Sequence, residues 1–99
     1  METRQVAIVS VTNEQSGQRG WVFDAHIESR GRASDHRISL SWADHDYWCH
    51  GAHAPARVIE ELLKVVDELG GLELLPARFD ASVLRRRFPG IDDAVQARL

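Results

Sequence analysis

The stretch from Ser41 to Gly51, SWADHDYWCHG, concentrates the side chains of this chain that could bind a metal or attack a substrate. It holds two aspartates, two histidines and the single cysteine of the sequence. Two pairs of these residues are four positions apart, a spacing that places both members on one face of a helix. Zinc binds four such ligands, or three with a water molecule, so a zinc site is one interpretation. The candidate ligands are His45, Asp46, Cys49, His50 and His53.

The other interpretation of this stretch is structural. The spacing matches none of the standard zinc signatures, such as CxxC or HExxH. Ser41 and Asp44 have the spacing of a helix capping box, and Gly51 suits the position that follows a helix. The pattern therefore predicts a short helix over Trp42–His50 that connects a strand to the next helix, and we favour this interpretation.

In such a helix, Asp46 and His50 pair at the surface while Trp42 and Trp48 pack beneath. Cys49 would need a nearby base and partial exposure to act as a nucleophile. A cysteine beside a tryptophan is more typical of a small buried hydrophobe. We therefore predict no catalytic residue in this stretch.

The composition is that of a globular domain. The 99 residues are 43% hydrophobic and 27% charged, so we expect one domain over residues 1–99. The net charge of −3 argues against a general nucleic-acid binder, which carries a basic excess. One cysteine permits no intramolecular disulfide, and the apolar run near the N-terminus is too short for a signal peptide or a membrane span. These features indicate a cytoplasmic protein.

Three segments predict strands. Gln5–Thr12 is rich in β-branched residues, and its weak alternation indicates a central strand or one buried on both faces. Trp21–Arg30 and Asp35–Trp42 alternate apolar and polar residues, which is typical of half-buried strands. Joined by a turn at Gly31–Ser34, these two segments predict an antiparallel sheet with one face in solvent.

The register of this hairpin is predicted from charge pairing. A four-residue loop places Arg30 opposite Asp35 and Ile27 opposite Ile38, so that opposite charges and apolar side chains face each other. A two-residue loop would instead bring two acidic residues together, which is mildly destabilising.

The helical period is clearest in His53–Gly71, where apolar residues recur every three or four positions. Pro55 suits the first helical position and Gly70 the position after the last turn. A short helix is predicted over Asp80–Phe88, with its first aspartate as the N-cap. Residues 91–99 form a final turn or a frayed tail. The outer face of the long helix is acidic, with Glu60, Glu61, Asp67 and Glu68.

These elements predict an α+β fold: a three-stranded antiparallel β-meander covered by one long helix, plus a short C-terminal helix. This order, with a C-terminal Leu-x-x-x-Phe-Asp…Phe-Pro segment, resembles a group of small uncharacterised bacterial proteins that have no assigned activity. The resemblance covers most of the chain and supports the architecture. The order is also similar to HicB-like antitoxins and to the core of double-stranded-RNA-binding domains. The residues that match the segment are Leu75, Phe79, Asp80, Phe88 and Pro89.

Arginines form a second candidate site. Three consecutive arginines at the end of the short helix point around it, because neighbours are about 100° apart. Cations also suit a helix C-terminus. We favour this structural role. The alternative is that these three arginines and Arg78 contact a phosphate or an acidic partner. The arginines of this patch are Arg30, Arg32, Arg37, Arg85, Arg86 and Arg87.

We expect a non-catalytic binding or regulatory module that acts through protein contacts. A homodimer is the simplest assembly, because a small open sheet leaves an edge to cover. Tyr47 and Trp48 are the candidate interface aromatics, and the polar face of the hairpin is either a solvated surface or a recognition surface. The alternatives are nucleic-acid binding through the arginine patch, and a metal-dependent enzyme or zinc sensor built on the five ligands above.

Overall fold

The computed structural model describes residues 7–99. These residues contain one mixed sheet of four strands. The strand order follows the chain, so β1 lies at one edge of the sheet. β1 and β3 both pair antiparallel with β2, and β4 pairs parallel with β3. The strands are β1 (Ile8–Ser16), β2 (Gly20–Ser29), β3 (Arg32–Ser41) and β4 (Arg78–Asp80).

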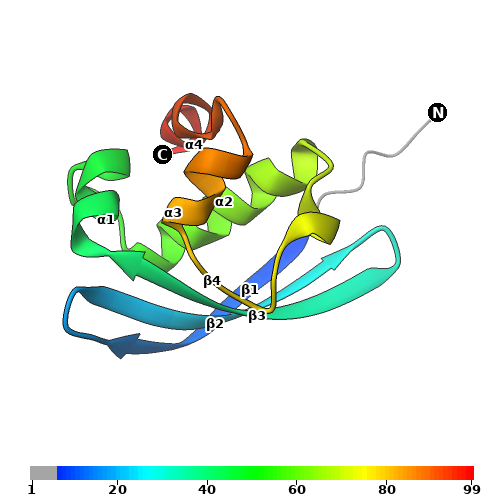
Figure 1. Ribbon diagram of the computed structural model, residues 1–99, viewed down its shortest axis with the longest axis horizontal. Helices are drawn as coiled ribbons and strands as arrows, with labels where there is room; N and C mark the ends of the chain where they lie inside the picture. Colours follow the sequence, from blue (N-terminus) through cyan, green and yellow to red (C-terminus); the bar gives the residue numbers. More distant parts are fainter. Residues whose placement is uncertain (1–6) are drawn as a thin grey trace.

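The helices of residues 7–99 all lie on one face of the sheet (Figure 1). α2 packs over β1 and β2, and α4 packs on α2 as the outermost layer. The predicted α+β class is therefore confirmed, but the predicted three-stranded meander under one long helix is enlarged by β4 and α4. The helices are α1 (Trp42–Cys49), α2 (Pro55–Glu68), the 3-10 turn η1 (Leu72–Leu74), α3 (Ser82–Arg87) and α4 (Ile91–Arg98).

β1 is an edge strand, so the prediction of a central or doubly buried strand over Gln5–Thr12 is wrong. The first two residues of the predicted strand, Gln5 and Val6, lie outside the described residues, and β1 begins at Ile8. The observed strand continues to Ser16 through an irregularity between Thr12 and Gln15, where Asn13 has a φ of 54°. Its run of β-branched residues reflects strand propensity at an edge rather than burial.

The β2–β3 hairpin has a tighter turn than predicted. Ser29 pairs with Arg32, and the two residues between them, Arg30 and Gly31, have φ values of 53° and 77°. Two successive positive φ values define the hairpin turn whose twist matches that of the strands. The charge-based register is therefore wrong by four positions, and Ile27 faces Ser34 instead of Ile38. An even shift leaves each side chain on the predicted face.

The segment after η1 contains a strand that the sequence pattern did not predict. β4 pairs through Arg78, Phe79 and Asp80 with the middle of β3. α3 begins at Ser82 and its N-cap is Ala81, so the prediction of Asp80 as the N-cap is wrong. The Asp80 carboxylate still accepts a hydrogen bond from the Ser82 N–H at 3.0 Å. α3 ends just before Phe88 and Pro89, in agreement with the predicted helix stop.

The C-terminal residues form a packed helix rather than a frayed tail. Ile91 and Val95 of α4 are buried against the rest of the core. α4 covers the side of α2 that carries Glu61, which is only 4% exposed. The prediction that Glu61 belongs to a solvent-exposed acidic face is therefore wrong.

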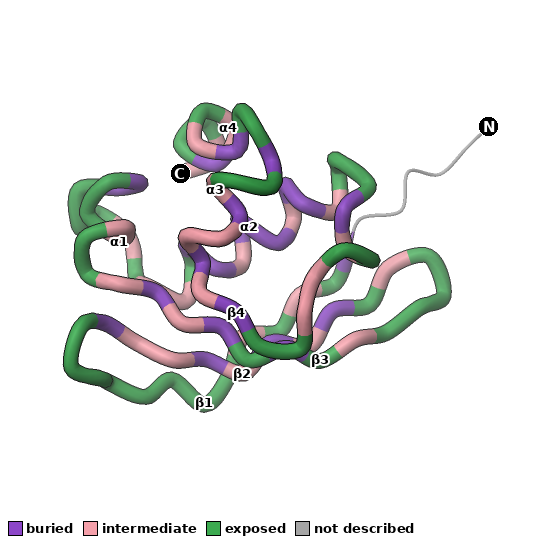
Figure 2. The backbone as a smooth tube through the Cα atoms, viewed as in Figure 1, coloured by how far each residue is buried: buried purple, intermediate pink, exposed green. Residues whose placement is uncertain are grey.

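The core lies between the inner face of the sheet and the helices (Figure 2). Phe23, Ile38 and Leu40 of the sheet meet the apolar stripe of α2, which includes Leu62 and Val66. The alternation in β2 and β3 and the helical period in α2 place these residues as predicted. No helix among residues 7–99 combines the length and the apolar character that crossing a membrane requires.

Candidate functional site

The stretch SWADHDYWCHG forms the predicted connector helix. The Ser41 hydroxyl accepts a hydrogen bond from the Asp44 N–H at 3.0 Å, which completes the predicted cap. His50 ends the helix with a φ of 52°, and Gly51 follows with a φ of 75°. The His50 N–H donates to the carbonyl of Asp46 at 2.7 Å, so these two residues meet through the backbone.

The five candidate zinc ligands are not arranged as a metal centre. His45 Nε2 lies 2.7 Å from the carbonyl of His53. A carbonyl only accepts, so this nitrogen carries a proton and has no lone pair for a metal. The buried Cys49 thiol donates to the carbonyl of His45 at 3.3 Å. Among residues 7–99, no three His, Cys, Asp or Glu side chains are grouped closely enough to hold an ion, so these residues do not fit zinc.

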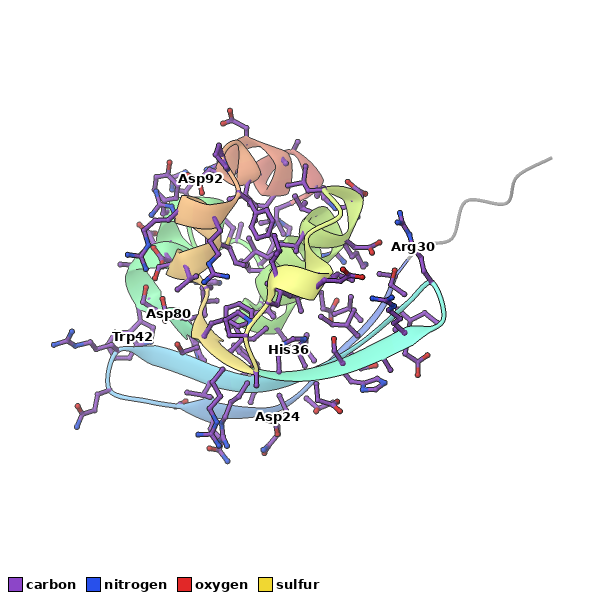
Figure 3. All side chains as sticks on the ribbon, turned by 45° about the vertical axis from the view of Figure 1, so that its right-hand side comes forward. Asp24, Arg30, His36, Trp42, Asp80 and Asp92 are labelled. Atoms are coloured by element: carbon purple, nitrogen blue, oxygen red, sulfur yellow. The ribbon has the colours of Figure 1, made fainter. Side chains whose placement is uncertain are left out.

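For the aromatic residues of α1, the predicted packing of Trp48 beneath the helix is confirmed and that of Trp42 is wrong. Trp48 is 2% exposed and donates through Nε1 to Asp92 Oδ1 at 2.7 Å, so it belongs to the core. Trp42 is 54% exposed and projects at one end of the sheet (Figure 3). Tyr47 is half-exposed, with the guanidinium of Arg85 stacked 4.2 Å from its ring centre. Of the two predicted interface aromatics, only Tyr47 is on the surface.

The arginine patch is dispersed. Arg85 ties α1, α3 and α4 together, because its guanidinium contacts Asp92 at 3.2 Å and Asp44 at 3.4 Å. Arg32 forms an ion pair with Glu73 of η1. Arg37 lies in the central part of β3, where it pairs with Asp24 of β2 and Arg78 of β4. These arginines therefore belong to separate parts of the molecule and do not form one track for a nucleic-acid backbone.

The strand pairings set the polar side chains of the outer face in rows. The first row crosses all four strands of the described sheet, from Thr12 through Asp24 and Arg37 to Arg78. Figure 3 shows Asp24 projecting away from the helices, whereas Asp92 lies in the helical layer. A neighbouring row contains Ser39 and Asp80, whose side chains form a hydrogen bond of 2.6 Å. This contact confirms that the side chains of β3 and β4 share the outer face.

His26 is paired with Asp35 in a third row, which adjoins the row of Arg37 on the side away from Ser39. It lies between two carboxylates. Its Nδ1 is 2.7 Å from Asp35 Oδ1 and its Nε2 is 3.2 Å from Glu28 Oε1. Both carboxylates accept only, so the protonated imidazole, which donates through both nitrogens, fits this site best. The hydrogen bonds to Asp35 and Glu28 raise the pKa of His26. This histidine therefore carries positive charge at a higher pH than an ordinary one.

The row that contains Arg37 and the row that contains His26 border a shallow cleft of about 430 Å³ on the outer face. Arg37 and Arg78 line it together with Thr12, Asp24 and Asp35. The sequence pattern singled out Arg37, but it missed Arg78 as a neighbour because it did not predict β4. No local signal could have paired the two, since they are joined by a contact between segments far apart in the chain.

The free edge of β1 is the second candidate surface. Figure 2 shows that most of this strand is exposed. Val9 and Val11 point toward the helices and are only partly buried against the core, while Ile8 is 62% exposed on the opposite face. No protein-family model, curated protein or solved structure matches the chain. The two surfaces, the cleft and the edge, are therefore the basis for assigning a function.

Proposed function

We propose that the protein is a small, non-catalytic binding module that acts through protein contacts and assembles as a homodimer. The observation that carries this proposal is the open edge of β1. An edge strand presents backbone N–H and C=O groups that can pair with a strand of another chain. A second copy of the chain supplies such a strand.

The sequence of this edge supports pairing. Residues 8–12 read IVSVT and contain neither a charged residue nor a proline, which are two of the features that natural proteins use to block edge pairing. The irregularity at Asn13 ends the regular part of the strand, because a bulge twists an edge out of register. The pairing surface is therefore confined to the regular part of the strand, Ile8–Thr12.

The edge is also complementary to itself. An antiparallel pairing centred on Ser10 would place Val9 of one copy opposite Val11 of the other. The four valines would extend the core beneath the helices, where Val9 and Val11 are now only partly buried. Cross-strand pairs of β-branched residues stabilise a sheet, so a second copy completes the burial that one copy leaves unfinished.

Native mass spectrometry and light scattering on untagged protein test this proposal. The wild-type protein should be dimeric at micromolar concentration. Ser10→Lys keeps an exposed position exposed but sets two lysines against each other at the centre of the pairing. Like charges directly opposite destabilise a strand pair, so we expect this variant to dissociate at a protein concentration at least about tenfold higher than wild type.

Gln18→Lys is the matched control, since it adds the same charge at an exposed turn position away from the edge. It should remain dimeric. A wild-type protein that stays monomeric at all concentrations would contradict the homodimer. A dimer that tolerates Ser10→Lys as well as Gln18→Lys would place the interface elsewhere.

A further inference from the structure

Arg37 and Arg78 are held side by side by the fold. They are directly paired residues of the parallel strands β3 and β4, and neighbouring strands are about 4.8 Å apart. The pair is fixed by the two residue pairs that follow it along the strands. Next to it, Ile38 and Phe79 are paired and buried in the core. Beyond them, Ser39 donates to Asp80. The backbone positions of the two arginines are therefore fixed next to each other, on the face of the sheet that Ser39 and Asp80 share.

Neither arginine forms an ion pair with any residue from 7 to 99. The carboxylates around them already have partners. Asp24 accepts from the Asn13 amide at 2.9 Å, and Asp35 is bound to His26.

Asp80 is also engaged, because it accepts hydrogen bonds from Ser39 and Ser82. Burial alone raises the pKa of Asp80, but these hydrogen bonds outweigh it, and the pKa lies below its ordinary value. Asp80 is therefore ionised, and its oxygens are directed to these two serines. Two like charges on neighbouring strands repel each other. Arg37 donates to Gln15 Oε1 at 3.5 Å, and no acidic group among residues 7–99 bridges the two arginines.

We propose that the cleft binds the phosphate group of a small phosphate monoester between Arg37 and Arg78. A carboxylate has two oxygens and is satisfied by one guanidinium in a bidentate contact. A phosphate monoester has three terminal oxygens and a double negative charge, so it can accept from two adjacent guanidinium groups at once. The pair of arginines therefore matches phosphate better than carboxylate.

The remainder of the cleft indicates what the phosphate is attached to. Its volume of about 430 Å³ lies within the range of small-molecule pockets. Asp24 and Asp35 line it, and each uses one carboxylate oxygen for its bond to Asn13 or His26. The second oxygen of each can accept a hydrogen bond from a hydroxyl or amino group. A nucleic acid would bring further phosphates next to these carboxylates, whereas a monoester brings only the one that the arginines hold. A small sugar phosphate has the required single phosphate and several hydroxyl groups.

Titration of the ¹⁵N-labelled protein followed by NMR tests this assignment. The probes are inorganic phosphate and ribose 5-phosphate, with ribose and sodium chloride of matched ionic strength as controls. We expect saturable shifts of the Nε–H signals of Arg37 and Arg78 with both phosphates, and none with ribose or chloride. Ribose 5-phosphate should bind more tightly than inorganic phosphate. Shifts that do not saturate, or that chloride reproduces, would overturn the assignment.

Arg37→Gln and Arg78→Gln should each weaken ribose 5-phosphate binding at least about tenfold, because each removes charge-assisted hydrogen bonds. Arg86→Gln, at an exposed position on α3, is the matched control and should bind like wild type. Equal weakening by Arg86→Gln would show a non-specific charge effect and overturn the site. Tighter binding of a short oligonucleotide than of ribose 5-phosphate, dependent on the same two arginines, would replace the small molecule by a nucleic acid.

A folding control separates loss of the site from loss of structure. Removing one of two repelling charges should leave the melting temperature of Arg78→Gln at or above that of wild type without phosphate. Added ribose 5-phosphate should then raise the melting temperature of wild type only, because a ligand stabilises the state that binds it. The same rise in both proteins would contradict binding at Arg78.

Discussion

Arg85 and Arg98 lie in the helical layer, and each of them contacts two carboxylates. Arg37 and Arg78 lie on the outer face of the sheet, and within residues 7–99 they form no ion pair. The same side chain thus has two roles in one small fold. In the helical layer arginine joins elements through ion pairs, whereas Arg37 on the sheet makes a hydrogen bond of 3.5 Å to Gln15 and no ion pair with residues 7–99.

The difference depends on which elements bring the acids. α4 contributes Asp92 to Arg85, and its own Arg98 reaches Glu61 and Glu68 of α2 at 2.7 Å. The outer face has acids as well, but these are taken up by Asn13, His26 and two serines. Whether an arginine forms an ion pair within the protein therefore depends on whether the neighbouring acids already have other partners.

Arg98→Ala should have the largest effect on stability. It removes the closest cation from Glu61, whose side chain is 5% exposed. Arg57 and Lys64 remain within 3.5 Å of this carboxylate, and Arg98 is itself partly exposed. We therefore expect a loss of about 1–3 kcal/mol rather than the full cost of an unpaired buried charge. Urea denaturation followed by circular dichroism gives this value.

Arg78→Ala is the matched comparison for the stability loss expected of Arg98→Ala. It removes an exposed arginine without an ion-pair partner among the described residues, so the free energy of unfolding should change by less than about 0.5 kcal/mol. Similar losses for the two variants would show that the helical layer and the sheet do not differ as proposed here.

The pH dependence of stability should come in part from Glu61. Burial by itself raises the pKa of Glu61, but the hydrogen bond from Arg98 and the charges of Lys64, Arg98 and Arg57 outweigh it, so the pKa is lowered. A folded pKa below the unfolded one stabilises the protein above the unfolded value, about 4.3. This contribution is lost as the pH falls through the folded pKa.

Denaturation of wild type and Glu61→Gln over a range of acidic pH measures this contribution. Glutamine has a similar size but cannot titrate, so the stability difference between the two proteins should be constant at neutral pH and shrink toward acid. A difference that stays the same at every pH would mean that Glu61 does not titrate with a lowered pKa.

The elements that the sequence predicted well are those with a local pattern. The alternation in β2 and β3, the helical period in α2 and the cap at Ser41 each depend on residues a few positions apart. The inner and outer faces of the hairpin were therefore predicted although its register was not, because the error was an even number of residues.

The features that were missed depend on contacts between distant segments. β4 is three residues long, and it is defined by its pairing with β3, in which Phe79 lies next to Ile38. α4 has a weak apolar pattern, and its burial follows from docking on α2, where Arg98 meets Glu61. Glu61 reads as a surface residue in the sequence, since nothing local shows that a cation from the C-terminus will cover it.

The candidate site shows the same limit. Arg37 and Arg78 were both candidate binding residues, but in separate groups, because their contact requires β4. Trp48 was assigned to an interface, but its indole N–H binds Asp92 within the helical layer. The metal interpretation of residues 45–53 fails on geometry, since the His45 ring and the Cys49 thiol bind backbone carbonyls.

His26 gives the smallest effect and the finest test of the outer face. Its pKa, raised by Asp35 and Glu28, should exceed the ordinary value of 6.5 when ring protons are followed by NMR. A raised folded pKa stabilises the protein below the unfolded value, and this is lost as the pH rises through the folded pKa. Asp35→Asn should lower the pKa more than Glu28→Gln, because Asp35 makes the shorter contact.

The same titration also reports on the phosphate cleft, because His26 and Asp35 lie in the row next to Arg37. A dianion bound between Arg37 and Arg78 favours the protonated imidazole nearby, so the pKa of His26 should rise further when ribose 5-phosphate is added. In Arg78→Gln this additional rise should disappear while the pKa without ligand stays raised. A rise that persists in the variant would mean that the phosphate binds elsewhere on the protein, and the arginines of the sheet would then differ from those of the helical layer only in being exposed.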